Sequence, residues 1–217
     1  MTPAYVALQV AAQAVSFDQA QAATLRKPHL WPGAEGRPTA AQAVWSTAGL
    51  HVAFTLADGL DPARDDPANK RSLENDDRVE VFVQPSAREP RYVAYEMNRA
   101  GHVLDYAVRI EDGRARLDYA WHGTATVQVI GDNPRTVLLI LIPWADLGLT
   151  GPPPRDDLRI GFYRGTPMRQ PDGSTAFRWS CWVDPQKAAV NFHCLETFAD
   201  LQLKRTATGN PGQEAGR

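Results

Sequence analysis

Hydrophobic and polar residues alternate over much of this chain, most strictly between residues 76 and 110. Within this stretch Val79, Val81 and Val83 fall on one face, while charged, aromatic and amide side chains fall on the other. Strict alternation is typical of a strand with one buried face. We therefore predict three consecutive strands, over residues 78–84, 91–98 and 102–110.

Similar short segments recur along the chain, separated by turns rich in glycine, proline, aspartate and asparagine. The further predicted strands cover residues 43–45, 50–57, 114–121, 124–130, 137–142, 158–165, 176–182 and 200–204. Of these, 137–142 is apolar throughout and is expected to be buried on both faces. Residues 5–15 are predicted as an edge strand and 143–148 as one helical turn. Roughly ten short strands favour an all-β protein, a single antiparallel β-sandwich of the jelly-roll kind with minor helical turns.

Polar side chains occupy the interiors of the two best predicted strands. Glu80, Glu96 and Asn98 lie there, near Phe82 and Tyr92. Such a face is either the solvated outside of a sheet or a site for a polar ligand. A sugar-sized site needs acceptors, donors and flat rings together, and this face offers all three.

Composition narrows the classes of function. The chain has 217 residues, 43% of them hydrophobic, and a net charge of −2. We expect one folded domain over residues 1–204 with a disordered tail over 205–217. The charge gives no reason to expect nucleic acid or an anionic membrane as partner. The N-terminus does not resemble a signal peptide, so the sequence as written predicts a cytoplasmic protein, and an extracellular or periplasmic one if a leader was trimmed.

Catalytic motifs are absent: there is no phosphate-binding loop, GxSxG elbow, HExxH helix or zinc-like spacing. No catalytic residue is therefore assigned, and no cofactor is required. Glu80 and Glu96 could face each other across neighbouring strands, and a carboxylate pair suits glycoside hydrolysis. A glycosidase is thus the alternative from the enzyme class.

Three further features leave alternatives open. Residues 58–77 form a long loop rich in aspartate, either a solvated acidic loop or a weak structural calcium site using Asp58, Asp76 and Asp77. The two cysteines, 181 and 194, are either two buried thiols or one disulfide. Trp31, flanked by proline and glycine, is the tryptophan we expect to be exposed.

Six pieces of the sequence, in this order, resemble carbohydrate-binding module family 9 and its family 9-like, DOMON-like relatives. They are AVWSTAGLHVAFTLAD (43–58), DDRVEVFVQP (76–85), YVAYEMNRAGHVLDY (92–106), LILIPWADLG (139–148), LRIGFYRG (158–165) and FHCLETFADLQL (192–203). The resemblance implies a β-sandwich that binds mono- or oligosaccharides without catalysis. It also implies service in bacterial polysaccharide breakdown or sugar recognition, with structural calcium as an option.

The family's sugar clamp carries over only in part. Family members hold a terminal sugar between two tryptophans; here the first position has Leu73 and Glu74, and the second has Phe192. The resemblance retains Glu80 and Asn98 as ligand contacts and places Glu96 where relatives have arginine. The substitutes proposed for the missing ring and donor are Phe192, His193, Trp179 and Arg164. If these residues do not bind a ligand, the rings belong to the core and Arg164 is an ion-pair partner on the surface. The protein would then be an interaction domain that has lost its ligand.

Overall fold

The computed structural model describes residues 3–64, 66–131, 135–154 and 157–205. The tail predicted from residue 205 onward lies, beyond Arg205 itself, outside the described residues. Within the described part no helix is long and apolar enough to cross a membrane.

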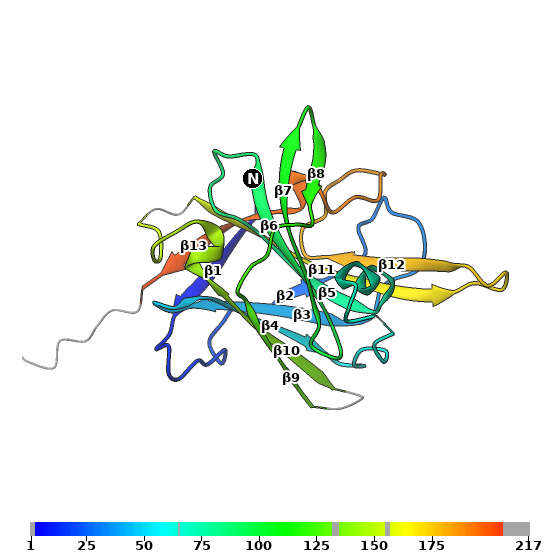
Figure 1. Cartoon of the computed structure of the whole chain (residues 1–217), viewed down its shortest axis with the longest axis horizontal. Coiled ribbons are helices and arrows are strands. Elements are labelled where there is room, and N and C mark those ends of the chain that lie inside the picture. The colour runs from blue at the N-terminus through cyan, green and yellow to red at the C-terminus, as the bar shows by residue number, and fades with distance from the viewer. Residues whose placement is uncertain (1–2, 65, 132–134, 155–156, 206–217) are drawn as a thin grey trace, which may run out of the picture.

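The described residues are almost entirely strands and loops, as predicted (Figure 1). The strands are β1 (Ala4–Gln9), β2 (Ala23–Leu25), β3 (Thr39–Trp45), β4 (Gly49–Leu56), β5 (Arg78–Gln84), β6 (Arg91–Asn98), β7 (Val103–Glu111), β8 (Arg114–Asp118), β9 (Thr126–Ile130), β10 (Thr136–Pro143), β11 (Leu158–Arg169), β12 (Thr175–Cys181) and β13 (Ala199–Lys204). The short 3-10 helices are η1 (Lys70–Asn75), η2 (Trp144–Leu147) and η3 (Leu195–Thr197). The described part thus has thirteen strands, more than the ten or so expected.

The strands form one curled sheet in the order β8-β7-β6-β5-β11-β13-β1-β3-β4-β10-β9, with β12 paired to β11 and β2 to β3. Figure 1 shows the β5–β8 end of this sheet crossing the β3, β4, β10 and β9 end, so that two layers face each other. Valines of β5 and apolar residues of β4 and β10 pack between the layers in one hydrophobic core. Burial of this apolar surface is the main force that holds the sandwich together.

The first strand departs from the prediction. β1 pairs with β13 and β3, and both pairings are parallel, so β1 lies inside the sheet and the sheet is mixed. The reason is its burial: Tyr5 and Ala7 both belong to the core. The Tyr5 hydroxyl also accepts a 2.7 Å hydrogen bond from the Ala43 backbone, which ties β1 to β3.

Other elements agree with their patterns or differ for a visible reason. The helical turn at 143–148 is present as η2 and ends at Gly148, whose φ of 73° is the left-handed conformation that glycine favours. The apolar strand β10 was expected to be buried on both faces, but one face is only half-buried: Leu138, Ile140 and Ile142 enter the core, and the residues that alternate with them do not. Both cysteines are free thiols.

The polar face of β5 and β6 is not a solvated outer face. A second apolar cluster covers it, with Phe82, Tyr92, Tyr106 and Phe198 among its members. His193 and Phe198 of the segment 184–198 pack on Phe82 on this side, and the main core covers the other, so every residue of β5 is buried. The carboxylates at 80 and 96 therefore lie inside the protein, where a charge needs a partner.

Candidate functional site

Eight residues from four parts of the chain surround a pocket of about 180 Å³ on the covered side of β5 and β6. They are Arg78 and Glu80 of β5, Glu96 of β6, Trp179 of β12, and Val190, Asn191, Phe192 and His193 of the following loop. Five of the seven predicted ligand-binding residues meet here: Glu80, Glu96, Trp179, Phe192 and His193.

Arg78 links the two carboxylates at the floor of this pocket. Glu80 and Glu96 are direct cross-strand partners, and Arg78 lies two residues from Glu80 on the same face. The Arg78 Nε donates to Glu96 Oε2 at 2.5 Å and lies 3.1 Å from Glu80 Oε1. The other oxygen of Glu96 accepts a 2.7 Å hydrogen bond from Tyr106. Glu96 is therefore fully engaged within the protein.

Glu80 is engaged only in part. The single N–H at Arg78 Nε points to Glu96, so Glu80 Oε1 is buried without a hydrogen-bond partner among the described residues. Burial raises the pKa of Glu80 to about 8, the nearby charge of Glu96 adds to this rise, and Arg78 opposes it. An unsatisfied buried oxygen is costly, which makes it a place where a ligand hydroxyl gains a bond.

Rings form the opposite wall of the pocket. Trp179 and Phe192 meet edge to face, with centroids 5.1 Å apart and planes 87° apart, so they do not form a parallel clamp. Gly165 lies beneath Trp179, and a Cβ there would come within 2.6 Å of the indole ring. The absence of a side chain at this position lets the indole lie across β11 toward Arg78, whose guanidinium carbon is 5.2 Å from the ring centroid.

His193 closes the wall as a neutral ring. It stacks on Phe82 with planes 11° apart, and its Nδ1 makes a 2.7 Å hydrogen bond with the Tyr92 hydroxyl. Burial lowers the pKa of His193 to about 4, and the charge of Arg78 contributes. The imidazole is therefore uncharged at neutral pH, and Nε2 is the nitrogen left for a ligand.

Trp31 was expected to be exposed, and that expectation was wrong. Its side chain is 3% exposed, because the ring packs on Phe192 with centroids 5.2 Å apart. Its indole nitrogen also donates to the Lys187 carbonyl at 2.9 Å. The loop around Trp31 thus supports the pocket wall from behind.

Asn98 was predicted as a ligand contact, but it does not line the pocket. Its Oδ1 accepts hydrogen bonds from the backbone of Ala100 and His102, which closes the β6–β7 turn. Its Nδ2 donates to Asp76 at 2.9 Å. Asparagine side chains readily form hydrogen bonds with nearby backbone groups. Here the Asn98 amide makes such bonds and does not reach the pocket.

Arg164 was also predicted as a ligand contact, and it lies on the other face of the sheet. It pairs in register with Val79, whereas the neighbouring Tyr163 pairs with Glu80. Its guanidinium forms a bidentate pair with Asp77 at 3.0 and 2.9 Å and donates to the Gly59 carbonyl at 2.8 Å. Because the side chain is fully buried, it is neither a ligand contact nor a surface ion-pair partner.

The aspartates proposed for calcium do not fit a cation site. Asp77 and Asp58 pair with both Arg164 and Arg37, at distances from 2.7 to 3.4 Å. Asp76 accepts hydrogen bonds from the Arg64 backbone and from Asn98. A donor set already opposed by two guanidinium groups would repel a divalent cation. Across the described ranges, no group of three or more His, Cys, Asp or Glu side chains could hold a metal ion.

Three pocket residues were missed at the level of sequence: Arg78, Val190 and Asn191. Arg78 had a usable signal, since it shares the face of Glu80 and a buried carboxylate pair needs a cation. Val190 and Asn191 are exposed residues of an irregular loop and carried no such signal.

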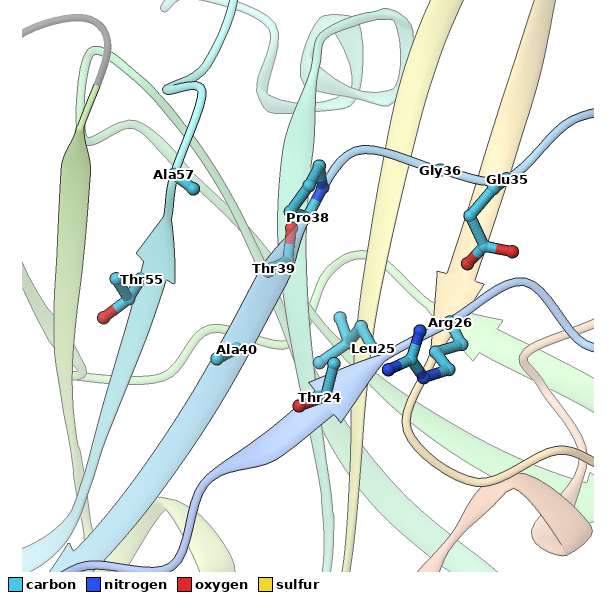
Figure 2. A pocket seen from close by; sticks show the side chains of 10 residues that line it. All are labelled: Thr24, Leu25, Arg26, Glu35, Gly36, Pro38, Thr39, Ala40, Thr55 and Ala57. Carbon is cyan, nitrogen blue, oxygen red and sulfur yellow. The ribbon is translucent and has the colours of Figure 1, made fainter.

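A larger cavity, of about 360 Å³, lies over β2, β3 and β4 (Figure 2). Thr24, Ala40 and Thr55 form a row across the three strands at its floor, and Arg26 and Glu35 lie together at one end. None of the predicted ligand-binding residues and no aromatic ring lines it. The smaller pocket is therefore the candidate site.

No family model and no curated protein matches the sequence. Solved structures do share its fold. A Bacteroides uniformis protein put forward as carbohydrate-binding has a TM-score of 0.66 and 16% identity, over 94% of this chain and 100% of its own. A family 9 carbohydrate-binding module from Caldicellulosiruptor kristjanssonii, in complex with cellotriose, has a TM-score of 0.63 and 12% identity, over 95% and 96%. A family 9 module from the same organism, in complex with glucose, has a TM-score of 0.59 and 13% identity, over 96% and 100%.

These similarities cover nearly the whole chain, but the sequence identities are so low that they establish only a shared fold. The chain therefore has the β-sandwich fold of the family 9 modules, as the sequence resemblance predicted.

Proposed function

We propose that this protein binds carbohydrate without cleaving it, in the pocket floored by Glu80 and Glu96. The observation that carries the proposal is that Glu80 lines a pocket walled by rings while its buried Oε1 has no hydrogen-bond partner among the described residues. Its fold relatives include modules in complex with glucose and cellotriose. A hydroxyl-rich ring ligand supplies what this pocket lacks, a hydrogen-bond donor for the free Glu80 oxygen and a flat face for the indole.

The pocket size favours a single sugar unit. Its volume of about 180 Å³ is below the roughly 300–1,000 Å³ common for drug-sized ligands. One pyranose would place a hydroxyl against Glu80 and its ring face against Trp179, with Nε2 of His193 facing a second hydroxyl. Further units of an oligosaccharide would extend past the exposed Val190 and Asn191.

Calorimetric titration with glucose, cellobiose and cellotriose tests this proposal. We expect saturable binding by the native protein and loss of that binding in Glu96→Ala, because Arg78 then turns fully to Glu80 and occupies its free oxygen. Glu89→Ala, which removes an exposed carboxylate outside the pocket, is the matched control and should bind as the native protein does. A folded native protein that is silent across a broad panel of sugars would contradict the proposal.

A glycosidase is the second candidate, because the raised pKa of Glu80 beside Glu96 is what a general acid requires. Against it, both carboxylates lie on one wall, on adjacent strands, and share one guanidinium. Hydrolysis needs two carboxyl groups that flank the bond to be cleaved. Turnover of aryl glycosides that disappears in Glu80→Gln would establish this activity; no turnover at high protein concentration would remove it.

An interaction domain that has lost its ligand is the third candidate. It would be favoured if the loop 58–77 covered the face that bears Glu96. The residues that line the pocket come from β5, β6, β12 and residues 190–193, and none comes from that loop. The open pocket therefore favours a retained ligand, and service in polysaccharide breakdown is the role we propose for it.

A further inference from the structure

A second groove lies on the opposite face of β6. Arg91 and Glu96 are five residues apart on this strand, so their side chains point to opposite faces. The groove has a volume of about 360 Å³, twice that of the pocket floored by Glu80 and Glu96, which we call the Glu80 pocket. Its charged lining residues are Arg91, Arg109, Arg116, Glu111, Asp118 and Asp146, and Trp121 and Tyr92 are its aromatic ones. We call it the arginine groove.

Three arginines occupy one row across this groove. Arg91 pairs in register with Arg109, and Arg109 pairs with Arg116, so like charges stand directly opposite on three adjacent strands. Such placement destabilises a sheet unless something compensates it. The β7–β8 hairpin that carries two of them projects from the top of the molecule in Figure 1.

The protein itself compensates this row only in part. Glu111 is shared by Arg109 and Arg116 at the long distances of 4.0 and 3.9 Å, and it is half exposed. Arg91 is bonded to Glu89. Exposed pairs of this kind contribute little free energy. The guanidinium groups of Arg109 and Arg116, each about two-thirds exposed, therefore keep most of their capacity to bind an anion.

The other end of the groove suits a sugar ring. Trp121 packs edge-on against Tyr95 with centroids 6.0 Å apart, which fixes the indole in place. Asp118 lies two residues from Arg116 on the same face; its Oδ1 accepts a 3.0 Å hydrogen bond from the Ala120 backbone, and its Oδ2 is the oxygen offered to a ligand. Asp146 also lines the groove, but it is occupied by Tyr95 and Thr124.

We infer that the arginine groove is a second binding site, for an anionic saccharide. The acidic group of one sugar unit pairs with Arg109 and Arg116, its ring packs on Trp121, and its hydroxyls donate to Asp118. This site is independent of the Glu80 pocket, because the two lie on opposite faces of β6 and share none of the residues that the inference uses.

Tryptophan indole signals in nitrogen-15 NMR give each site its own reporter, Trp121 for the groove and Trp179 for the pocket. The ligands are a galacturonic acid trisaccharide, a sulfated galactose trisaccharide and the neutral galactose trisaccharide. We expect the Trp121 signal to move saturably with an anionic trisaccharide and at least tenfold more weakly with the neutral one. Raising the salt concentration should weaken this binding.

Arg109→Gln/Arg116→Gln should raise the dissociation constant for the anionic ligand at least tenfold. Arg114→Gln, which removes one charge from the same hairpin outside the groove, is the matched control and should change it little. A response to uronate alone or to sulfate alone supports the site and identifies the acidic group. An unmoved Trp121 signal with all three ligands, or equal affinity in the double variant, overturns it. Glu96→Ala should leave the Trp121 response intact, so failure at the pocket stays distinguishable from failure at the groove.

Discussion

Arg78 is the residue on which the chemistry of the Glu80 pocket depends. Its buried guanidinium contacts Glu96 and Glu80, and it also donates to the Glu74 carbonyl at 2.7 Å. Buried carboxylates of this kind are tolerated only with such a partner. Alternation places Glu80 opposite the valines of β5, and the register of the β5–β6 pairing places Glu96 directly across from it on the same face.

Asn98 and Arg164 were wrongly predicted as ligand contacts, because alternation along a strand does not determine what a side chain will bond to or which strand it will lie beside. Asn98 has the correct face, yet its amide serves the turn that follows. Whether Arg164 lies on the same face as Glu80 is set by the register in which β11 pairs with β5. A long-range register cannot be read from either strand alone.

The structural role of Arg164 gives a stability prediction. Arg164→Met leaves the fully buried Asp77 without its bidentate partner, so we expect the free energy of unfolding to fall by about 3–5 kcal/mol. Urea denaturation measures this change. Arg169→Met, at the exposed end of the same strand, is the control and should stay within about 0.5 kcal/mol. Equal, small effects of both substitutions would show that Arg164 is not structural.

Glu80 gives a pH prediction. Its pKa is raised from 4.5 to about 8, so between these values the folded chain holds a proton that the unfolded chain has released. Stability from this group is complete below pH 4.5 and is lost as the pH rises toward 8. His193 acts in the opposite sense, since its pKa is lowered from 6.5 to about 4, but it is silent above pH 6.5.

Urea denaturation between pH 6.5 and 8 isolates the contribution of Glu80. The free energy of unfolding of the native protein should fall, by up to about 1.4 kcal/mol per pH unit. Glu80→Gln, which carries no titrating proton, should lose this slope. The same slope in both proteins would mean that Glu80 titrates normally.

At the scale of elements, the loops rather than the strands decide the shape of the pocket. The strand segments were predictable because alternation and turn residues mark them locally. The covering of β5 and β6 was not, since it depends on residues 184–198, which pack on this face from far along the chain. The parallel pairing of β1 was missed for the same reason: no local signal says which strand a segment will join.

Contacts between two distant loops give a prediction at this scale. Trp31 packs on Phe192, and His29 bonds to Asp184 at 2.8 Å, so residues 28–38 hold the 184–193 segment in place. Trp31→Ala should weaken sugar binding in calorimetry, although Trp31 lies outside the pocket, and should lower stability by about 3–5 kcal/mol. Leu30→Ala, at an exposed neighbour, is the control. Native affinity in a folded Trp31→Ala protein would show that this support is dispensable.

At the scale of the whole molecule, one curled sheet presents two different surfaces. The Glu80 pocket lies on one face of β6 and the arginine groove on the other, and the two halves of the sheet bury the main core between them. The all-β class and its likeness to family 9 modules could be predicted, because many short patterned segments in order constrain the architecture strongly. The closed aromatic wall could not, because it combines residues from segments about 100 positions apart.

The most direct test of the central claim is a crystal structure of the protein grown with a saturating concentration of cellotriose. We expect one sugar unit in the pocket, with a hydroxyl within about 3 Å of Glu80 Oε1 and its ring face against Trp179. Cellotriose bound elsewhere, with no sugar near Glu80, would contradict the account.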